Sequence, residues 1–116
     1  MLFRSVLVCS GTNGEFTLED AMVAGGYVEA LVAQGDRWSL PTLSDSAIAA
    51  RRLWQGETNL LRGWMEGRHA QYLGDAGFGD DLGYCAGVDV NSTAPRLCQR
   101  EETSSLSYPV VLVREF

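Results

Sequence analysis

The sequence contains no lysine, one histidine and three prolines among its 116 residues. Its nine basic residues are all arginine, and fifteen acidic residues give a formal net charge of −6. This surplus of negative charge argues against nucleic acid and anionic membrane surfaces as partners. No apolar run approaches the ~20 residues that a membrane-spanning helix needs. The composition therefore argues against partners that bind a basic surface, and the sequence has no segment that could form a membrane-spanning helix.

Cysteine is also scarce, with three residues that are far apart in the sequence: Cys9, Cys85 and Cys98. An odd number without close spacing excludes a disulfide framework and a zinc site. We expect all three to be small core residues in a reducing compartment, which indicates a cytoplasmic location. The apolar segment at the N-terminus is too short for a secretory signal.

A chain of this length forms one domain or part of one. Continuous apolar runs predict buried strands over residues 6–9 and 109–113. Patterns typical of helices cover much of the chain between them: residues 17–34, 44–55, a short helix from residue 58, residues 66–75 and residues 80–85. Two or three strands among so much helix cannot close an α/β domain with a parallel sheet. Either another chain completes the sheet, or this chain is part of a larger domain.

The first predicted helix carries apolar residues at three- and four-residue spacings, which gives it one apolar face. Gly25 and Gly26 lie in its middle, where each glycine costs roughly 1 kcal/mol against alanine. Such a pair indicates close packing on a neighbour or a kink. We expect Gly35 to end this helix and Ser44 to cap the next one.

The loop before this helix is the part of the sequence where we expect chemistry. It contains small and polar residues that follow the first strand: Ser10, Gly11, Thr12, Asn13 and Gly14. Backbone N–H groups at the start of a helix can hold an anion, and acids in its first turn can hold a cation. A plain strand–helix connection explains the same residues, with Thr17 as N-cap and Asp20 as its capping-box partner. The loop is neither a P-loop nor a dinucleotide fingerprint.

Five segments in the same order resemble the C-terminal half of the 2-phosphosulfolactate phosphatase family, and together they cover roughly residues 6–98. They are residues 8–20 with 24–25 ("CAGT-G-F-LED---AG"), 44–47 with 49–50 ("-DSA--A"), 69 with 73 ("H---L"), 77–89 ("GF--DL-YCA--D") and 94–95 ("VP"). The resemblance implies a three-layer α/β/α fold built from two similar halves, of which this helix-rich chain with two or three short strands is one half. The expected division is residues 1–98, the C-terminal part of a phosphatase-like domain, and residues 99–116, a polar linker and a terminal strand.

The resemblance also implies a Mg²⁺-dependent phosphatase of coenzyme M biosynthesis that hydrolyses 2-phosphosulfolactate to sulfolactate and phosphate. It implies substrate binding by Ser10, Gly11, Thr12, Asn13 and Gly14, metal binding by Glu19 and Asp20, and catalytic roles for Asp20 and His69. Adjacent helical residues point ~100° apart, so we expect one of the two acids to dominate at the metal, with Asp20 favoured. The alternative for both acids is stabilisation of the helix dipole, and a lone helical histidine is commonly structural.

Segments that resemble the N-terminal half of the family are absent from this sequence. We therefore expect a truncated phosphatase that is inactive alone. The alternative is a non-catalytic remnant, or an interaction module that self-associates as a homo-oligomer through exposed sheet edges.

Overall fold

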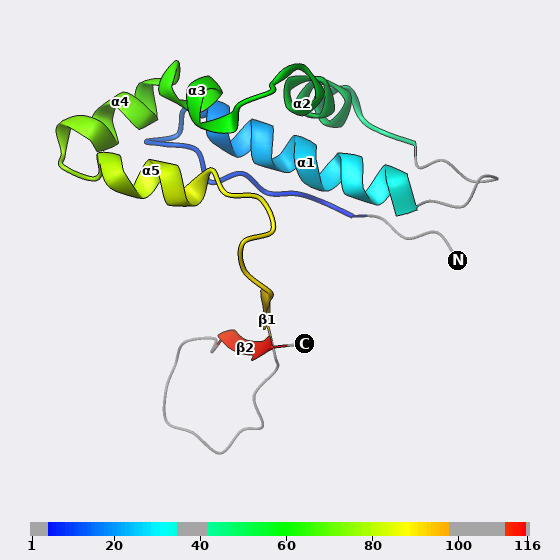
Figure 1. Cartoon of the computed structure of the whole chain (residues 1–116). Coiled ribbons are helices and arrows are strands. Elements are labelled where there is room, and N and C mark those ends of the chain that lie inside the picture. The colour runs from blue at the N-terminus through cyan, green and yellow to red at the C-terminus, as the bar shows by residue number, and fades with distance from the viewer. Residues whose placement is uncertain (1–4, 35–41, 98–110, 116) are drawn as a thin grey trace. The chain divides into compact units, whose positions relative to one another are not determined.

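A computed structural model of the chain describes residues 5–34, 42–97 and 111–115. The chain divides into two compact units, Met1–Ala86 and Gly87–Phe116. The first unit holds all five helices of the described residues (Figure 1), and their bounds are α1 Leu18–Gln34, α2 Asp45–Gly56, α3 Leu60–Met65, α4 Arg68–Asp75 and α5 Gly79–Cys85. The prediction of a helix-rich chain with few strands is confirmed.

Helices α1 and α2 form the main packed pair of the first unit. Their backbones approach closely at the two glycines predicted to mark a contact. A Cβ atom added at Gly25 would collide with the carbonyl oxygen of Ala50, and one at Gly26 would lie 3.0 Å from the Trp54 ring. Arg51 donates to Glu29 at 2.6 Å across the same interface. The glycine pair therefore serves close helix packing, as the sequence indicated.

Two of the described helices, α2 and α3, begin at a capping side chain. The Ser44 hydroxyl accepts from the Ala47 N–H at 3.2 Å, which confirms Ser44 as the N-cap of α2. Helix α3 was expected to begin at Thr58. Its N-cap is Asn59, one residue later, whose side chain accepts from the Arg62 N–H at 3.0 Å. Helix α4 begins at Arg68, two residues after the predicted start. Gly35, the expected end of α1, lies outside the described residues.

The capping box predicted at the start of α1 is wrong. The buried Thr17 hydroxyl has no hydrogen-bond partner, so it does not cap the helix. The Asp20 carboxylate instead accepts from the backbone N–H of Gly11 at 2.8 Å, across nine residues of chain. Asp20 is therefore engaged with the preceding loop rather than with its own helix turn.

The strand predicted over residues 6–9 does not form a ladder. These residues are extended, but within the described part of the chain their backbone makes no hydrogen bond to another backbone. Val6 and Val8 are 81% and 87% exposed, so the prediction of burial on both faces is wrong for this chain. The expectation of core cysteines also fails, because Cys9 and Cys85 are both exposed; Cys98 lies outside the described residues. An extended apolar run is buried only if other strands and helices cover it.

Within its described residues, the second unit contains one antiparallel pair of strands, β1 (Thr93–Leu97) and β2 (Val111–Glu115). The register pairs Thr93 with Glu115 and Leu97 with Val111. The strand was expected over residues 109–113. In the described chain β2 begins at Val111 and ends at Glu115, two residues beyond the predicted end. Residues 109 and 110 lie outside the described residues.

The apolar core of the described residues is small and belongs to the first unit. Its buried members come from α1, α3, α4 and α5: Ala21, Met22, Val28, Trp64, Ala70 and Leu82. None of the helices described is both long enough and apolar enough to cross a bilayer.

Candidate functional site

The loop before α1 is a tight turn centred on Asn13 and Gly14. Thr12 and Glu15 exchange two backbone hydrogen bonds, of 3.1 Å and 2.9 Å. Asn13 and Gly14 between them have φ angles of 54° and 78°. Positive φ at both central residues is typical of two-residue hairpin turns, for which Asn-Gly is a preferred pair. The Asn-Gly dipeptide is the sequence signal for this turn.

Gly11 fixes the loop to the start of α1. Its φ of 64° is left-handed, and a Cβ atom there would collide with the carbonyl of Glu15. Its N–H donates to Asp20 Oδ2, and the Ser10 hydroxyl donates to the same oxygen at 3.4 Å. The Gly11 N–H holds the pKa of Asp20 below its ordinary value, because it stabilises the charged form. Asp20 therefore anchors the loop as a carboxylate.

His69 joins the loop to α1 from a helix far along the chain. Its Nδ1 lies 3.1 Å from the Thr12 hydroxyl, and its Nε2 lies 3.9 Å from Oε1 of Glu19. A carboxylate beside Nε2 favours the tautomer that carries the proton there, which leaves Nδ1 to accept from Thr12. The structure thus brings together predicted site residues from residues 10–14, from α1 and from α4.

The Glu19 side chain is largely enclosed at the start of α1. Its side chain is 18% exposed, and its second oxygen, Oε2, is buried without a hydrogen-bond partner. An acceptor in that state lacks the stabilisation that a buried carboxylate normally has. Glu19 is therefore the predicted site residue with an unused ligand atom.

A groove of about 470 Å³ adjoins these residues. It lies between the extended segment and helices α1, α3, α4 and α5. Its charged or titratable side chains are Glu19, Asp20 and His69, besides Tyr27 and two cysteines. Its other lining residues are mainly apolar: Leu7, Val8, Val23, Ala24, Tyr27, Trp64, Ala70, Leu73 and Leu82. No arginine lines the groove, so the described residues around it offer no fixed positive charge to an anion.

The carboxylates beside the groove suit a magnesium ion in kind but not in number. Carboxylate oxygens are the ligands that Mg²⁺ prefers, and Mg²⁺ takes few of them while keeping several waters. The unpartnered Glu19 Oε2 and the carboxylate of Asp20 suit this pattern in kind. The described residues contain no group of three or more histidine, cysteine, aspartate or glutamate side chains placed to hold a metal. The chain can thus contribute two carboxylates to such a site.

Sequence reasoning did not identify the apolar side of the site. Val23, Tyr27 and Leu31 recur every four residues along α1 and stay exposed, and the first two line the groove. Val23, Tyr27 and Leu31 thus form a second apolar face of α1, beside the single one predicted. The four-residue spacing of these three residues was the available signal.

Known proteins match most of this chain. The family profile described as 2-phosphosulpholactate phosphatase matches residues 4–100. The chain is 36% identical over 93 residues to a "Probable 2-phosphosulfolactate phosphatase" of Thermotoga maritima, covering 79% of this chain and 38% of the relative. A protein of the same name from Gloeobacter violaceus is 37% identical over 93 residues, which is 78% of this chain and 35% of the relative. The chain thus spans little more than a third of the length of these relatives.

Proposed function

The chain belongs to the 2-phosphosulpholactate phosphatase family, and we propose that it supplies part of the active site for Mg²⁺-dependent hydrolysis of 2-phosphosulfolactate to sulfolactate and phosphate. The observation that carries the proposal is the meeting of residues 10–14, Glu19, Asp20 and His69 at the start of α1. In the complete family fold the chain would be one half of a three-layer α/β/α domain, in a cytoplasmic enzyme of coenzyme M biosynthesis.

Charge explains why this site needs a cation. A phosphomonoester is an anion, yet the groove is lined by two carboxylates and no arginine. Glu19 and Asp20 would hold the Mg²⁺. When bound, the ion supplies positive charge for the phosphoryl oxygens and orients a water for attack. Without it, the carboxylates would repel the substrate.

The chain's own groups would bind the substrate in a limited way. The N–H groups of Thr12 and Glu15 donate to each other's carbonyl oxygens within the turn, and the Gly11 N–H donates to the Asp20 carboxylate. Within the loop, the backbone N–H groups of Ser10, Asn13 and Gly14 have no acceptor among the described residues, so they are available to an anion. His69, held by Thr12 and Glu19, would give or take a proton at Nε2.

The proposal is tested by joining this chain to the part of the Thermotoga maritima relative that lies outside the matched region. We expect the joined protein to hydrolyse 2-phosphosulfolactate, EDTA to abolish turnover, and the 116-residue chain alone to show none above background. Glu19→Gln and Asp20→Asn should slow turnover by orders of magnitude and shift its Mg²⁺ dependence. His69→Asn should slow it by ~10²–10⁴-fold if the imidazole transfers a proton.

Asp45→Asn is the matched control, because Asp45 is also a first-turn acid but belongs to α2 and is exposed. It should leave kcat and the Mg²⁺ dependence unchanged. If the Glu19 and Asp20 variants behave like Asp45→Asn, the two acids only stabilise the helix and its loop. Turnover by the 116-residue chain itself, abolished by EDTA, would show instead that the site is complete without further polypeptide.

A further inference from the structure

The side chain of Asn13 is free, unlike those of the other two asparagines of the chain, Asn59 and Asn91. The Asn59 side chain accepts from the Arg62 N–H at 3.0 Å, and the Asn91 side chain accepts from the Thr93 N–H at 2.8 Å. The Asn13 side chain is exposed and makes no hydrogen bond within the described residues. The carboxamide of Asn13 is therefore held by no contact that would keep it from reacting.

The backbone nitrogen that follows Asn13 is also unhindered. The Gly14 N–H has no acceptor among the described residues, and nothing lies within 4 Å of a Cβ atom added at Gly14. The other two asparagines are followed by Leu60 and Ser92, whose side chains crowd the backbone nitrogen that glycine leaves open. An exposed carboxamide next to an open backbone nitrogen is the arrangement that leads to deamidation.

The reaction needs no group besides this dipeptide and water. The Gly14 nitrogen loses its proton and attacks Cγ of Asn13. The bond from the Gly14 nitrogen to Cγ forms, the bond from Cγ to Nδ2 breaks, and Nδ2 leaves as ammonia. Water then opens the cyclic succinimide. Cleavage of the new bond gives aspartate, and cleavage of the original peptide bond gives isoaspartate, in which the main chain runs through the side chain.

We propose that Asn13 is a site of spontaneous modification and that isoaspartate there switches off the loop. Aspartate keeps the turn, because Asp-Gly also favours positive φ at both central residues. Isoaspartate adds a carbon atom to the main chain, so Thr12 and Glu15 no longer exchange their two hydrogen bonds. Thr12, displaced with the turn, then loses its contact of 3.1 Å with Nδ1 of His69.

Both products also change the charge of the loop. Each adds a carboxylate beside the exposed Glu15 and the backbone N–H groups available to an anion. Like charges repel, so the modified loop binds a phosphoester less well. This consequence rests on the proposed function, whereas the modification and the loss of the Thr12 contact do not.

The turn is the barrier to this reaction, because the Gly14 nitrogen reaches Cγ only when ψ of Asn13 changes. Two backbone hydrogen bonds between Thr12 and Glu15 close the turn, and Asn13, Gly14 and Glu15 are all exposed. Exposed loop tips open locally without unfolding of the helices behind them. The modification therefore proceeds in the folded chain.

Peptide mass mapping of the 116-residue chain tests the site. The purified chain is incubated at mildly alkaline pH, at a temperature where circular dichroism shows its helices intact. We expect the replacement of NH₂ by OH at Asn13 to be at least several-fold faster than at Asn91. Isoaspartyl methyltransferase should label the aged chain. Asn13→Gly is the matched control, because Gly-Gly also suits the turn but cannot cyclise, and it should lose most of this labelling.

The switch is tested by NMR at His69, which is the only histidine of the chain. A nuclear Overhauser contact between the His69 ring and the Thr12 side chain should be present in the fresh chain and lost in the isoaspartate form. Asn13→Asp, which adds the charge without the extra carbon atom, should keep it. Modification at Asn13 that is no faster than at Asn91 overturns the site. An unchanged contact in the isoaspartate form overturns the switch, whether or not the joined protein is a phosphatase.

Discussion

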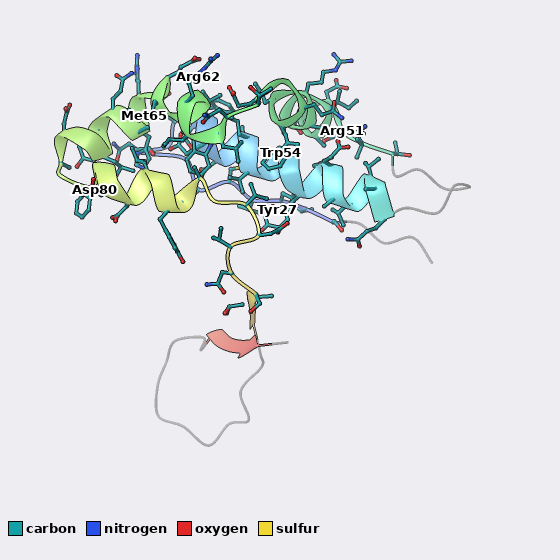
Figure 2. The ribbon with its side chains drawn as sticks, in the orientation of Figure 1. Tyr27, Arg51, Trp54, Arg62, Met65 and Asp80 are labelled. Atoms are coloured by element: carbon teal, nitrogen blue, oxygen red, sulfur yellow. The ribbon has the colours of Figure 1, made fainter. Side chains whose placement is uncertain are left out.

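The two sides of α1 differ in how completely they are packed. One side meets α2 at Gly25 and contributes Met22 and Val28, both almost fully buried, to the core. The other side carries Val23 and the aromatic Tyr27 (labelled in Figure 2), which remain exposed beside the groove. Figure 1 shows α2 and the extended N-terminal segment on different sides of α1. A helix that is apolar on both sides is typical of one buried in a larger domain.

This difference shows which contacts the chain completes by itself. The α1–α2 contact has close backbone approach, an ion pair and a helix cap, and the two helices with the cap of α2 supply all of them. The groove side has a loop anchored by Asp20 and His69 but no second layer within the described residues. The stability of the chain should therefore depend on the side of α1 that faces α2, and the proposed chemistry on the side that faces the groove. Substitutions on each side can separate these two effects.

Gly25→Ala should have the largest effect, at about 3 kcal/mol of lost unfolding free energy. The added methyl collides with the Ala50 carbonyl, which is backbone and cannot rotate away, and this outweighs the ~1 kcal/mol by which alanine is the better helix former. Urea unfolding followed by circular dichroism measures it.

Gly83→Ala is the control for that change, because Gly83 is helical and nothing lies within 4 Å of its added Cβ. It should stabilise the chain by up to ~1 kcal/mol. Equal losses in both variants would mean that α1 and α2 do not approach closely at Gly25.

A matched pair of valines compares the two sides of α1 directly. Val28→Ala removes two buried carbons from the packed side and should cost about 2 kcal/mol. Val23→Ala removes the same atoms from the groove side, where Val23 is 39% exposed, and should cost less than ~0.5 kcal/mol. In the protein that joins this chain to the unmatched part of the Thermotoga maritima relative, the cost of Val23→Ala should rise toward that of Val28→Ala. A cost that stays small there would show that the groove remains open in the larger protein.

The helices were predictable because their signals are local. Ser44 as a cap, the glycine pair and the apolar periodicity each act within a few residues. The strand over residues 6–9 failed as a prediction for this chain because strand formation depends on a partner. The apolar run favours an extended backbone, but nothing in the run itself supplies the second strand with which it would pair. The burial of Cys9 and Cys85 failed for the same reason, since both line the groove that lacks a cover.

The candidate site was predictable as a set of residues but not as a set of contacts. The resemblance brought together residues 10–14, the acids of α1 and His69, and the structure places them side by side. It did not reveal that Asn13 and Gly14 form a hairpin turn or that Asp20 reaches the Gly11 N–H. Those contacts depend on how the chain reverses direction before α1. Their roles in binding and catalysis stay predictions.

The smallest expected effect concerns Asp20 and pH. Its pKa is lowered in the folded chain, chiefly by the Gly11 N–H, so the charged carboxylate stabilises the fold. A lowered folded pKa gives stability that is present above the ordinary aspartate value of ~4 and is lost as the pH falls through the folded value. Because the side chain is only part-buried, we expect the charged carboxylate to contribute less than ~1 kcal/mol to the unfolding free energy.

Asp20→Asn should thus lower the unfolding free energy at pH 7 and 5. The difference in unfolding free energy between this variant and the wild type should narrow below pH ~4. A gap between wild type and Asp20→Asn that is constant from pH 7 to 3 would mean that the Gly11 contact does not depend on the charge of Asp20.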